Sequence, residues 1–253
     1  MRLGAALPLP APGEATPDSF LADAARRLAN TGYESIWTFD SIGRGETSPD
    51  PLMILAVAAT VTKDIELATG ILQIPLRETV DLANRILTAQ LICGERLLLG
   101  VGCGSTKADF DAVGASFEHR FELLDSQMLA LRTLIETGKY EHVDLTPWPI
   151  TSRALTWMLG TWGKHVSTAA RHYDGWIASA HYRTDPELAT ALQRYRRAGG
   201  TRAIVTNLVV NKDSDFADIR VRLEHAADIG FDDAVVVFEE ATERTMQTIR
   251  KLI

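Results

Sequence analysis

Hydrophobic residues recur along the chain in two patterns. Residues 65–72 and 97–105 are short, largely apolar runs without strict alternation, which is typical of strands buried on both faces of a parallel sheet. Between them, residues 79–92 place leucine, isoleucine and alanine three or four positions apart, and this spacing predicts a helix with one buried face. The pattern therefore predicts a strand–helix–strand unit over residues 65–105.

The same unit repeats along the whole chain. Neighbouring predicted strands are mostly about 30 residues apart, the span of one strand, one helix and two turns. Eight such units favour a closed (β/α)8 TIM barrel formed by one domain, residues 1–253, and an open doubly wound sheet is the alternative because periodicity does not show closure. The eight strands are centred on Leu3, Ile36, Leu67, Leu98, Thr156, Trp176, Ile204 and Ala234.

Helix boundaries and one long connection complete the expected architecture. Helices are expected to begin at Thr16-Pro17 and Asp50-Pro51, where a capping side chain precedes a proline. The longest helix is expected to carry Phe117 to Ile135. Between strands four and five, Tyr140 to Arg153 has no clear period and predicts a long irregular connection. Trp148 within it is interpreted as a lid over the barrel or as a plug in its mouth.

Composition narrows the range of partners. The net charge is −7 and no basic run occurs, which disfavours nucleic acid and anionic membranes as partners. No apolar run approaches the roughly 18 residues of a membrane span, so we expect a cytoplasmic protein. Cys93 and Cys103 are the only cysteines, too few for a disulfide framework or a four-thiolate metal site.

In a barrel of this type the functional site is built from the carboxyl ends of the strands and the loops that follow them. These positions are rich in glycine and poor in charge, which favours a large planar ligand over a metal ion or a sugar. Neither a metal-ligand spacing, a Gly-x-Ser-x-Gly motif nor a Gly-x-Gly-x-x-Gly fingerprint occurs. The positions are Asp40, Gly70 to Leu72, Gly102 to Ser105, Gly160 to Gly163, His181, Asn211, Glu239 and Glu240.

Five segments, in order along the chain, resemble the bacterial luciferase-like flavin oxidoreductases. The resemblance implies a barrel that binds FMN or the deazaflavin F420 at the strand carboxyl ends and acts on a small organic substrate by hydride transfer or monooxygenation. It also implies a separate flavin or F420 reductase as a partner and a homodimer. The segments are Gly32 to Trp37, Ala68 to Leu72 with Pro75-Leu76-Arg77, Gly94 to Gly102, Asp109 to Gly114 and Asp174 to Ile177.

The resemblance also implies roles for individual residues. Gly70-Ile71-Leu72 matches a backbone bulge, often with a non-prolyl cis peptide, behind the isoalloxazine ring, and Gly102-Cys103-Gly104 matches a loop that flanks the ring. Gly160-Thr161-Trp162-Gly163 matches a phosphate site, and a helix amino terminus there would aim free N–H groups at an anion. Asp40 matches a polar position beside the ring.

Asp40 and His181 are the expected catalytic residues, and each has a plain structural alternative. Asp40 could cap a loop, and His181 could be an ordinary surface histidine. Cys103 is interpreted as a packing residue rather than a nucleophile, because no basic neighbour in the sequence would lower its pKa. Glu239-Glu240 is either an acid/base pair or a solvated turn. Ser41 follows Asp40 where many relatives carry histidine.

Two other functions remain open at this point. A non-catalytic flavin-binding protein could use the same barrel. A phosphate-binding lyase or isomerase could use it as well, although no lysine is expected at a strand end to form a Schiff base.

Overall fold

Eight parallel strands close into a barrel in the computed structural model, which describes residues 1–10, 16–46, 48–146, 148, 155–181 and 183–253. Closure is shown by β1, which pairs with both β10 and β2, in the strand order β1-β10-β9-β8-β7-β4-β3-β2. The predicted (β/α)8 fold is therefore confirmed. The barrel strands are β1 (Arg2–Ala6), β2 (Ser35–Thr38), β3 (Glu66–Gln73), β4 (Leu97–Gly102), β7 (Thr156–Gly160), β8 (Gly175–Ser179), β9 (Ala203–Val210) and β10 (Asp233–Phe238).

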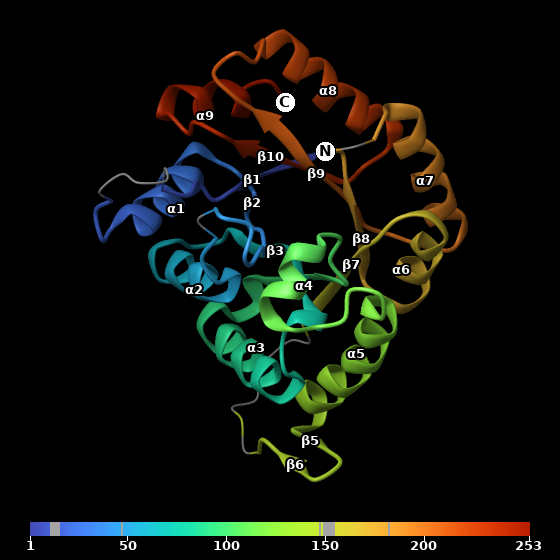
Figure 1. Ribbon diagram of the computed structural model, residues 1–253. Helices are drawn as coiled ribbons and strands as arrows, with labels where there is room; N and C mark the ends of the chain where they lie inside the picture. The colour runs from blue at the N-terminus through green and yellow to red at the C-terminus, as the bar shows by residue number, and fades with distance from the viewer. Residues whose placement is uncertain (11–15, 47, 147, 149–154, 182) are drawn as a thin grey trace.

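Helices surround the strands, and α4 lies in front of the barrel in Figure 1, after the carboxyl end of β4. Several begin or end at the residues that the sequence indicates. The Asp50 carboxylate accepts hydrogen bonds from the first amides of α2, and Gly32 ends α1 in a left-handed conformation. The helices are α1 (Phe20–Thr31), α2 (Pro51–Val61), α3 (Thr79–Cys93), α4 (Lys107–Val113), α5 (Arg120–Thr137), α6 (Val166–His172), α7 (Asp185–Arg197), α8 (Phe216–Ile229) and α9 (Glu243–Arg250), with 3-10 turns η1 (Ile74–Leu76), η2 (Gly94–Arg96) and η3 (Gly163–His165).

The region between β4 and β7 differs from the expectation in two places. A separate helix, α4, precedes α5, so Phe117 lies before the long helix rather than in it. The predicted irregular connection begins as a two-stranded hairpin, β5 (Lys139–Tyr140) with β6 (Val143–Asp144). Trp148 is half-buried, and its role as a lid or plug stays a prediction. Residues 147 and 149–154 of this connection lie outside the described residues.

The first helix begins later than predicted. The amide of Phe20 donates a hydrogen bond to the carbonyl of Pro17 at 2.9 Å, so Thr16-Pro17 opens a turn and α1 starts only at Phe20. Its buried residues are Ala24, Ala25 and Leu28.

One side chain from each of seven strands fills the barrel interior. This cluster is buried because strands of a closed parallel barrel bury both faces. Glycine is required where the packing is closest: a Cβ atom on Gly100 would lie 2.0 Å from the carbonyl oxygen of Thr69 and 2.4 Å from Cδ1 of Ile177. Ile71, half-buried, packs against the cluster, which comprises Trp37, Ala68, Leu98, Met158, Ile177, Ile204 and Val235.

An ion-pair network lies at the amino ends of the strands. Arg202 donates to both oxygens of Glu66 and of Asp233, at 2.7 to 3.0 Å, and the Asp233 side chain is 1% exposed. Burial alone would lower the pKa of Arg202, but these carboxylates outweigh it and raise the pKa. This end of the barrel is therefore held by charge pairs, whereas the other end carries the predicted site.

None of the helices in the described ranges is long and apolar enough to cross a membrane.

Candidate functional site

The backbone is irregular at the end of β3, as predicted. The peptide bond between Gly70 and Ile71 is cis, and the pairing register between β3 and β4 shifts between Gly70 and Leu72. Leu72 is fully buried, while Ile71 is half-buried. Ile71 is thus the residue of this bulge whose side chain lies between the barrel interior and the barrel mouth.

Ile71 packs against two of the predicted glycines. A Cβ atom on Gly102 would lie 2.8 Å from Cδ1 of Ile71, and a Cβ atom on Gly160 would lie 2.3 Å from its Cγ2. Any larger residue at either position would therefore displace Ile71. The structure brings together the ends of β3, β4 and β7 in one apolar surface, which we call the Ile71 floor: Ile71, Gly102 and Gly160.

Cys103 and Gly104 form the loop beside this floor. Gly104 has φ +79°, and a Cβ atom there would lie 2.0 Å from Oε1 of Gln73, so both the conformation and the space require glycine. Cys103 is half-buried, and burial raises the pKa of its thiol although Arg120 acts in the opposite direction. A raised pKa favours the packing interpretation of Cys103 over a nucleophilic one.

Arg120, at the start of α5, lies beside Cys103 and was not indicated by the sequence analysis. Its Nη1 donates a hydrogen bond to the Phe117 carbonyl at 2.7 Å. Its guanidinium lies 3.9 Å from the ring centroid of Phe117 and 4.7 Å from that of Phe121. Nε is buried without a hydrogen-bond partner, and no carboxylate in the described part of the chain forms an ion pair with it. A lone arginine has no periodic signature, which is why the pattern did not indicate it. It leaves a positive charge beside Cys103 that an anion could neutralise.

The turn Gly160 to Gly163 follows β7 and leads through η3 into α6. The Thr161 carbonyl accepts a hydrogen bond from the Trp176 indole at 2.9 Å, and Trp162 lies under the guanidinium of Arg183 at 4.6 Å. His165 in η3 stacks on Phe121 at 5.0 Å. Since Phe121 also lies under Arg120, the predicted phosphate turn and the unneutralised arginine are on the same side of the barrel mouth.

Asp40 is bound in an ion pair. Nη1 and Nη2 of Arg77 lie 2.6 and 2.9 Å from its two carboxylate oxygens, and the amide of Gln73 donates to it at 2.8 Å. Burial alone would lower the pKa of Arg77, but Asp40 outweighs it and raises the pKa. The geometry favours a bracing role for Asp40, and the predicted catalytic role stays a prediction.

Beside Asp40, the loop after β2 is held by a second buried carboxylate that the sequence analysis did not single out. Asp109 of α4 is 0% exposed and accepts hydrogen bonds from the Ile42 amide at 3.2 Å, from Nε of Arg44 at 2.7 Å and from Nη2 of Arg44. Gln73 donates to the same carboxylate at 2.8 Å. The loop after β2, the end of β3 and α4 are therefore joined.

The remaining predicted positions lie on the surface. His181 is exposed after β8, and its amide donates to the Ser179 hydroxyl at 3.3 Å. The Asn211 side chain accepts from Asp213 and Ser214 within its own turn, and Glu239 and Glu240 are exposed in a bend. The described residues contain no group of three or more His, Cys, Asp or Glu side chains arranged to hold a metal ion.

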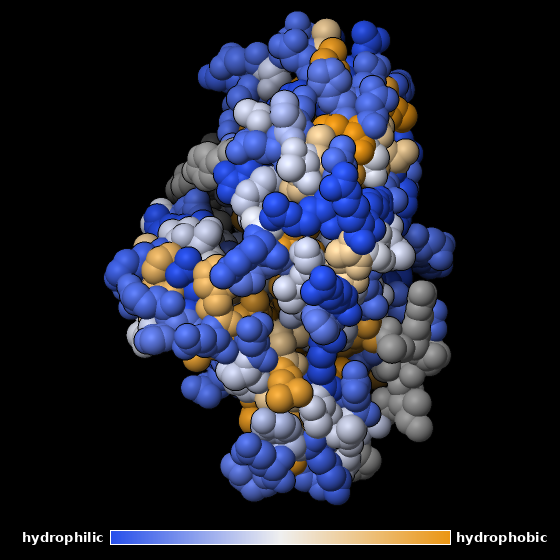
Figure 2. Space-filling model, turned by 90° about the vertical axis from the view of Figure 1, so that its right-hand side faces the viewer, coloured by the Kyte–Doolittle hydropathy of each residue, from blue (hydrophilic) through white to orange (hydrophobic). Residues whose placement is uncertain are grey.

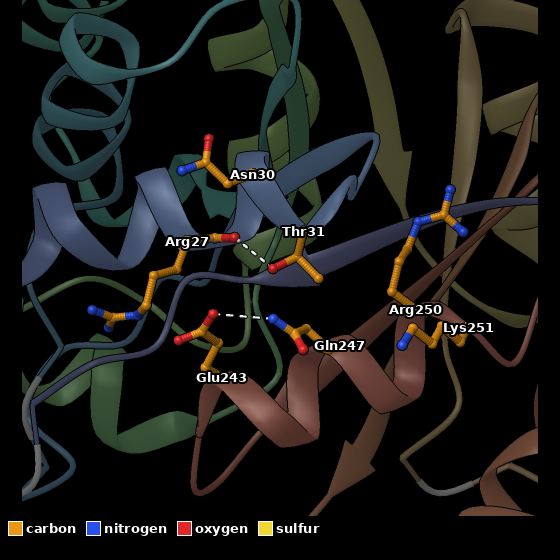
Figure 3. Close-up of a pocket in the computed structure, with 7 residues that line it drawn as sticks. All are labelled: Arg27, Asn30, Thr31, Glu243, Gln247, Arg250 and Lys251. Carbon is orange, nitrogen blue, oxygen red and sulfur yellow. Dashed lines mark hydrogen bonds between the residues drawn. The ribbon is translucent and has the colours of Figure 1, made fainter.

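Two polar grooves lie outside the barrel wall, away from the Ile71 floor. One, of about 280 Å³, lies between α1 and α9, and Figure 3 shows its lining residues Arg27, Asn30, Thr31, Glu243, Gln247, Arg250 and Lys251. The other, of about 360 Å³, lies between α6 and α7 on the mainly hydrophilic side seen in Figure 2, and is lined by Ser167, Arg171, Thr190, Gln193, Arg194, Arg197 and Ala198. Neither includes a predicted site residue.

Curated relatives match parts of the chain. A monooxygenase of Streptomyces nodosus subsp. asukaensis, 4-hydroxyprotoasukamycin monooxygenase, is 34% identical over 94 residues, which cover 36% of this chain and 25% of that protein. The 5,10-methylenetetrahydromethanopterin reductase of Methanolobus tindarius is 30% identical over 119 residues, covering 47% and 35%. The matches thus span about a third or less of these relatives.

Solved structures share the fold over nearly the whole chain. The monooxygenase RslO1 from Streptomyces bottropensis superposes with a TM-score of 0.82 at 17% identity, covering 100% of this chain and 97% of that one. An F420-dependent secondary alcohol dehydrogenase bound to an F420-acetone adduct gives 0.79 at 14% identity, covering 100% and 98%. The FMN-bound oxygenating component of 3,6-diketocamphane monooxygenase from Pseudomonas putida gives 0.65 at 17% identity, covering 92% and 80%.

The luciferase-like monooxygenase family model matches residues 1–217, most of the chain. The match includes β3, β4 and β7, whose ends form the Ile71 floor. The chain therefore belongs to the luciferase-like monooxygenase family.

Proposed function

We propose that the protein is an oxidoreductase that uses reduced FMN or F420 to act on a small organic substrate. The observation that carries the proposal is the Ile71 floor, an apolar surface bordered by glycines at the ends of three strands. Ligands of TIM barrels bind at this end. One structural neighbour bound to F420 and another bound to FMN support the proposal without choosing between the two cofactors.

The residues present fit the ring system of either cofactor. A flat tricyclic ring needs an apolar surface that backbone can approach closely, and glycine allows that approach because it has no Cβ atom. Ile71, Gly102 and Gly160 would hold the ring, since any side chain at either glycine would displace Ile71. The fully buried cluster beneath Ile71 keeps the floor dry.

The residues also fit the phosphate that both cofactors carry. Arg120 has no carboxylate partner among the described residues and has a buried Nε without a partner. Its guanidinium would bind the phosphate together with backbone N–H groups of the Gly160 to Gly163 turn, on the same side of the mouth. Arg77 and Arg44, by contrast, are already neutralised by Asp40 and Asp109.

The cofactor, when bound, supplies a hydride or, in the case of FMN, activates oxygen. The chain has to bind it, exclude water and hold protons. Ser41, next to Asp40, donates from its hydroxyl to the Glu46 carboxylate at 2.9 Å. The Ser41 hydroxyl is thus a proton-bearing group next to Asp40, whose own oxygens accept hydrogen bonds from Arg77.

Turnover of reduced cofactor is the test. The protein is mixed anaerobically with reduced FMN or reduced F420, and cofactor oxidation is followed optically with a panel of ketones, aldehydes and alkenes. In a second arm oxygen is added with each compound and oxygenated product is measured by mass spectrometry, because reduced FMN reacts with oxygen without an enzyme. We expect binding of at least one cofactor and turnover that depends on an added substrate. Binding without turnover by any acceptor would instead identify a non-catalytic flavin-binding protein. Absence of binding by both cofactors would overturn the proposal.

Arg120→Gln tests the phosphate anchor separately. We expect this variant to lose affinity for FMN by roughly tenfold or more, equivalent to about 1.4 kcal/mol or more, and to bind riboflavin, which has no phosphate, as the wild type does. Equal losses for FMN and riboflavin would contradict the anchor role.

A further inference from the structure

The side chain of Gln73 joins three parts of the barrel mouth. Gln73 is the last residue of β3 and is 2% exposed. Its Nε2 group donates one hydrogen bond to the carbonyl oxygen of Asp40 at 2.8 Å and one to Oδ2 of Asp109 at 2.8 Å. Both hydrogens of one amide group are therefore used, one on the loop after β2 and the other on α4.

The two acceptors belong to segments that are themselves fixed. Asp40 is paired with Arg77, and Asp109 is paired with Arg44 and holds the Ile42 amide. Without the Gln73 side chain, the end of β3 would still be joined to the loop after β2 by the hydrogen bonds of the Gln73 backbone amide and of Arg77 to Asp40. Within the described part of the chain, by contrast, the Gln73 side chain is the one group of β3 that donates a hydrogen bond to the Asp109 carboxylate.

The third contact of Gln73 is steric. Because both acceptors require the NH2 group, Oε1 must point the other way, and it has no hydrogen-bond partner among the described residues. It lies 2.0 Å from where a Cβ atom on Gly104 would be. The amide oxygen thus fills the space beneath the loop Cys103-Gly104, which flanks the Ile71 floor.

We propose that Gln73 is a positioning residue of the cofactor site, whose amide fixes the loop after β2, α4 and the Cys103-Gly104 loop relative to the Ile71 floor. The inference rests on the proposed function. Gln73 lies two residues after Ile71, about 7 Å along the strand at the usual rise of a β-strand. It therefore acts through the backbone and its neighbours and does not touch the ring-binding surface itself.

We expect substitution of Gln73 to have a large effect on the cofactor site, although Gln73 lies outside the Ile71 floor. A displacement of about 1 Å in an active site can cost about a hundredfold in rate. Gln73→Leu keeps a similar volume but removes both donors and leaves the Asp40 carbonyl and one Asp109 oxygen with fewer partners. The loops around the floor would then be free to adopt other arrangements.

The test compares Gln73→Leu with Tyr33→Phe. Tyr33→Phe removes one buried hydrogen bond, from the Tyr33 hydroxyl to the Met246 carbonyl of α9 at 2.9 Å. We expect Gln73→Leu to weaken FMN or F420 binding by roughly tenfold or more, and Tyr33→Phe to leave it within twofold although both variants lose stability. Unchanged binding by Gln73→Leu, or equal losses in both variants, would overturn the proposal. If Gln73→Leu fails to fold, Gln73→Met keeps the length and removes the same donors.

A double-mutant cycle measures whether Gln73 and Asp109 affect cofactor affinity together. A general loss of stability would not produce such coupling. Asp109→Asn removes the charge that Gln73 binds, and if the two residues act through one hydrogen bond their effects on cofactor affinity are less than additive. Tyr33→Phe combined with Gln73→Leu is expected to be additive. Additive effects in the Gln73 and Asp109 cycle would contradict the proposal.

Hydrogen exchange separates this inference from the proposed function. If the wild type binds neither FMN nor F420, the proposed function fails, but the positioning contacts are still measurable without cofactor. We expect Gln73→Leu to raise amide exchange in residues 40–44 and in α4, and Tyr33→Phe not to do so. Unchanged exchange in both segments would overturn the positioning role on its own.

Discussion

Asp40 and Arg77 form a two-point ion pair at the carboxyl ends of β2 and β3, with side chains only 1% and 9% exposed. Removing one partner of a buried pair typically costs about 3–5 kcal/mol. We expect the lower end of this range for Asp40→Asn, because Asp50 lies 3.7 Å from Arg77 and remains to neutralise it. Urea unfolding measures this loss.

The same variant addresses the predicted catalytic role of Asp40. Because its carboxylate is occupied by Arg77, we expect Asp40→Asn to lower activity and stability together. Loss of activity at unchanged stability would contradict the bracing role. Asp81→Asn, at a carboxylate that is 65% exposed, is the matched control and should change neither property.

Cys103 reports on occupancy of the site. Its thiol is half-buried beside the Ile71 floor, whereas Cys93 is 2% exposed and burial raises the pKa of the Cys93 thiol to about 11. We expect an alkylating reagent near neutral pH to modify Cys103 slowly and Cys93 more slowly still, and bound FMN or F420 to slow only the Cys103 reaction. Mass spectrometry of the modified peptides measures both rates. Cofactor protection of Cys93 alone would place the cofactor elsewhere.

Asp109 should make the folded protein less stable as the pH falls into the acid range. Burial alone would raise the pKa of Asp109, but hydrogen bonds from Arg44, Gln73 and the Ile42 amide outweigh it and lower the pKa below its ordinary value. A carboxyl whose pKa is lower in the folded state stabilises the fold above its unfolded pKa, about 3.9, and loses that contribution as pH falls through the folded pKa.

Gln73→Leu removes one of these hydrogen bonds, so we expect its acid unfolding, followed by circular dichroism, to begin at a higher pH than in the wild type. Tyr33→Phe should lower stability without moving the acid dependence. Parallel acid curves for all three proteins would show that Asp109 does not contribute.

Arg202 is expected to matter for stability alone. It bridges Glu66 and the buried Asp233 at the amino ends of the strands, so Arg202→Gln should lower the free energy of unfolding by about 3–5 kcal/mol. Arg220→Gln, in an exposed pair with Glu224, should change it by less than about 1 kcal/mol. Cofactor affinity should be unchanged in both variants while they remain folded. A loss of cofactor affinity in folded Arg202→Gln alone would contradict a role in stability only.

The hydrophobic pattern of the sequence was sufficient to predict the barrel strands. Each of the eight barrel strands contains the residue on which the sequence centres it, because each strand is a short, largely apolar run. The irregular backbone at Gly70 to Leu72 was implied by the family resemblance rather than by the pattern. The helix α4 was missed because seven residues are too few to establish a helical period.

The side-chain contacts of the site were less accessible from sequence. Gln73 and Asp109 are 36 residues apart, and hydrogen bonds over that separation leave no periodic signal in the chain. Asp40 was located correctly at a strand end, but its ion pair with Arg77 depends on the fold. Arg120 was missed for the same reason. The role of His181, the reductase partner and the homodimer stay predictions.

The most direct test of the central claim is the affinity of the wild type and of Gly160→Leu for FMN and F420, measured side by side. A leucine at this position would occupy the space of Ile71, since even a Cβ atom would lie 2.3 Å from its Cγ2. Gly199→Ala is the control, because Gly199 has φ +96° with open space around it and should affect stability only. We predict that the wild type and Gly199→Ala bind the same cofactor and that Gly160→Leu binds it about a hundredfold more weakly or not at all, equivalent to about 2.8 kcal/mol or more. Equal binding by the wild type and Gly160→Leu, or no binding of either cofactor by the wild type, would contradict a flavin site on the Ile71 floor.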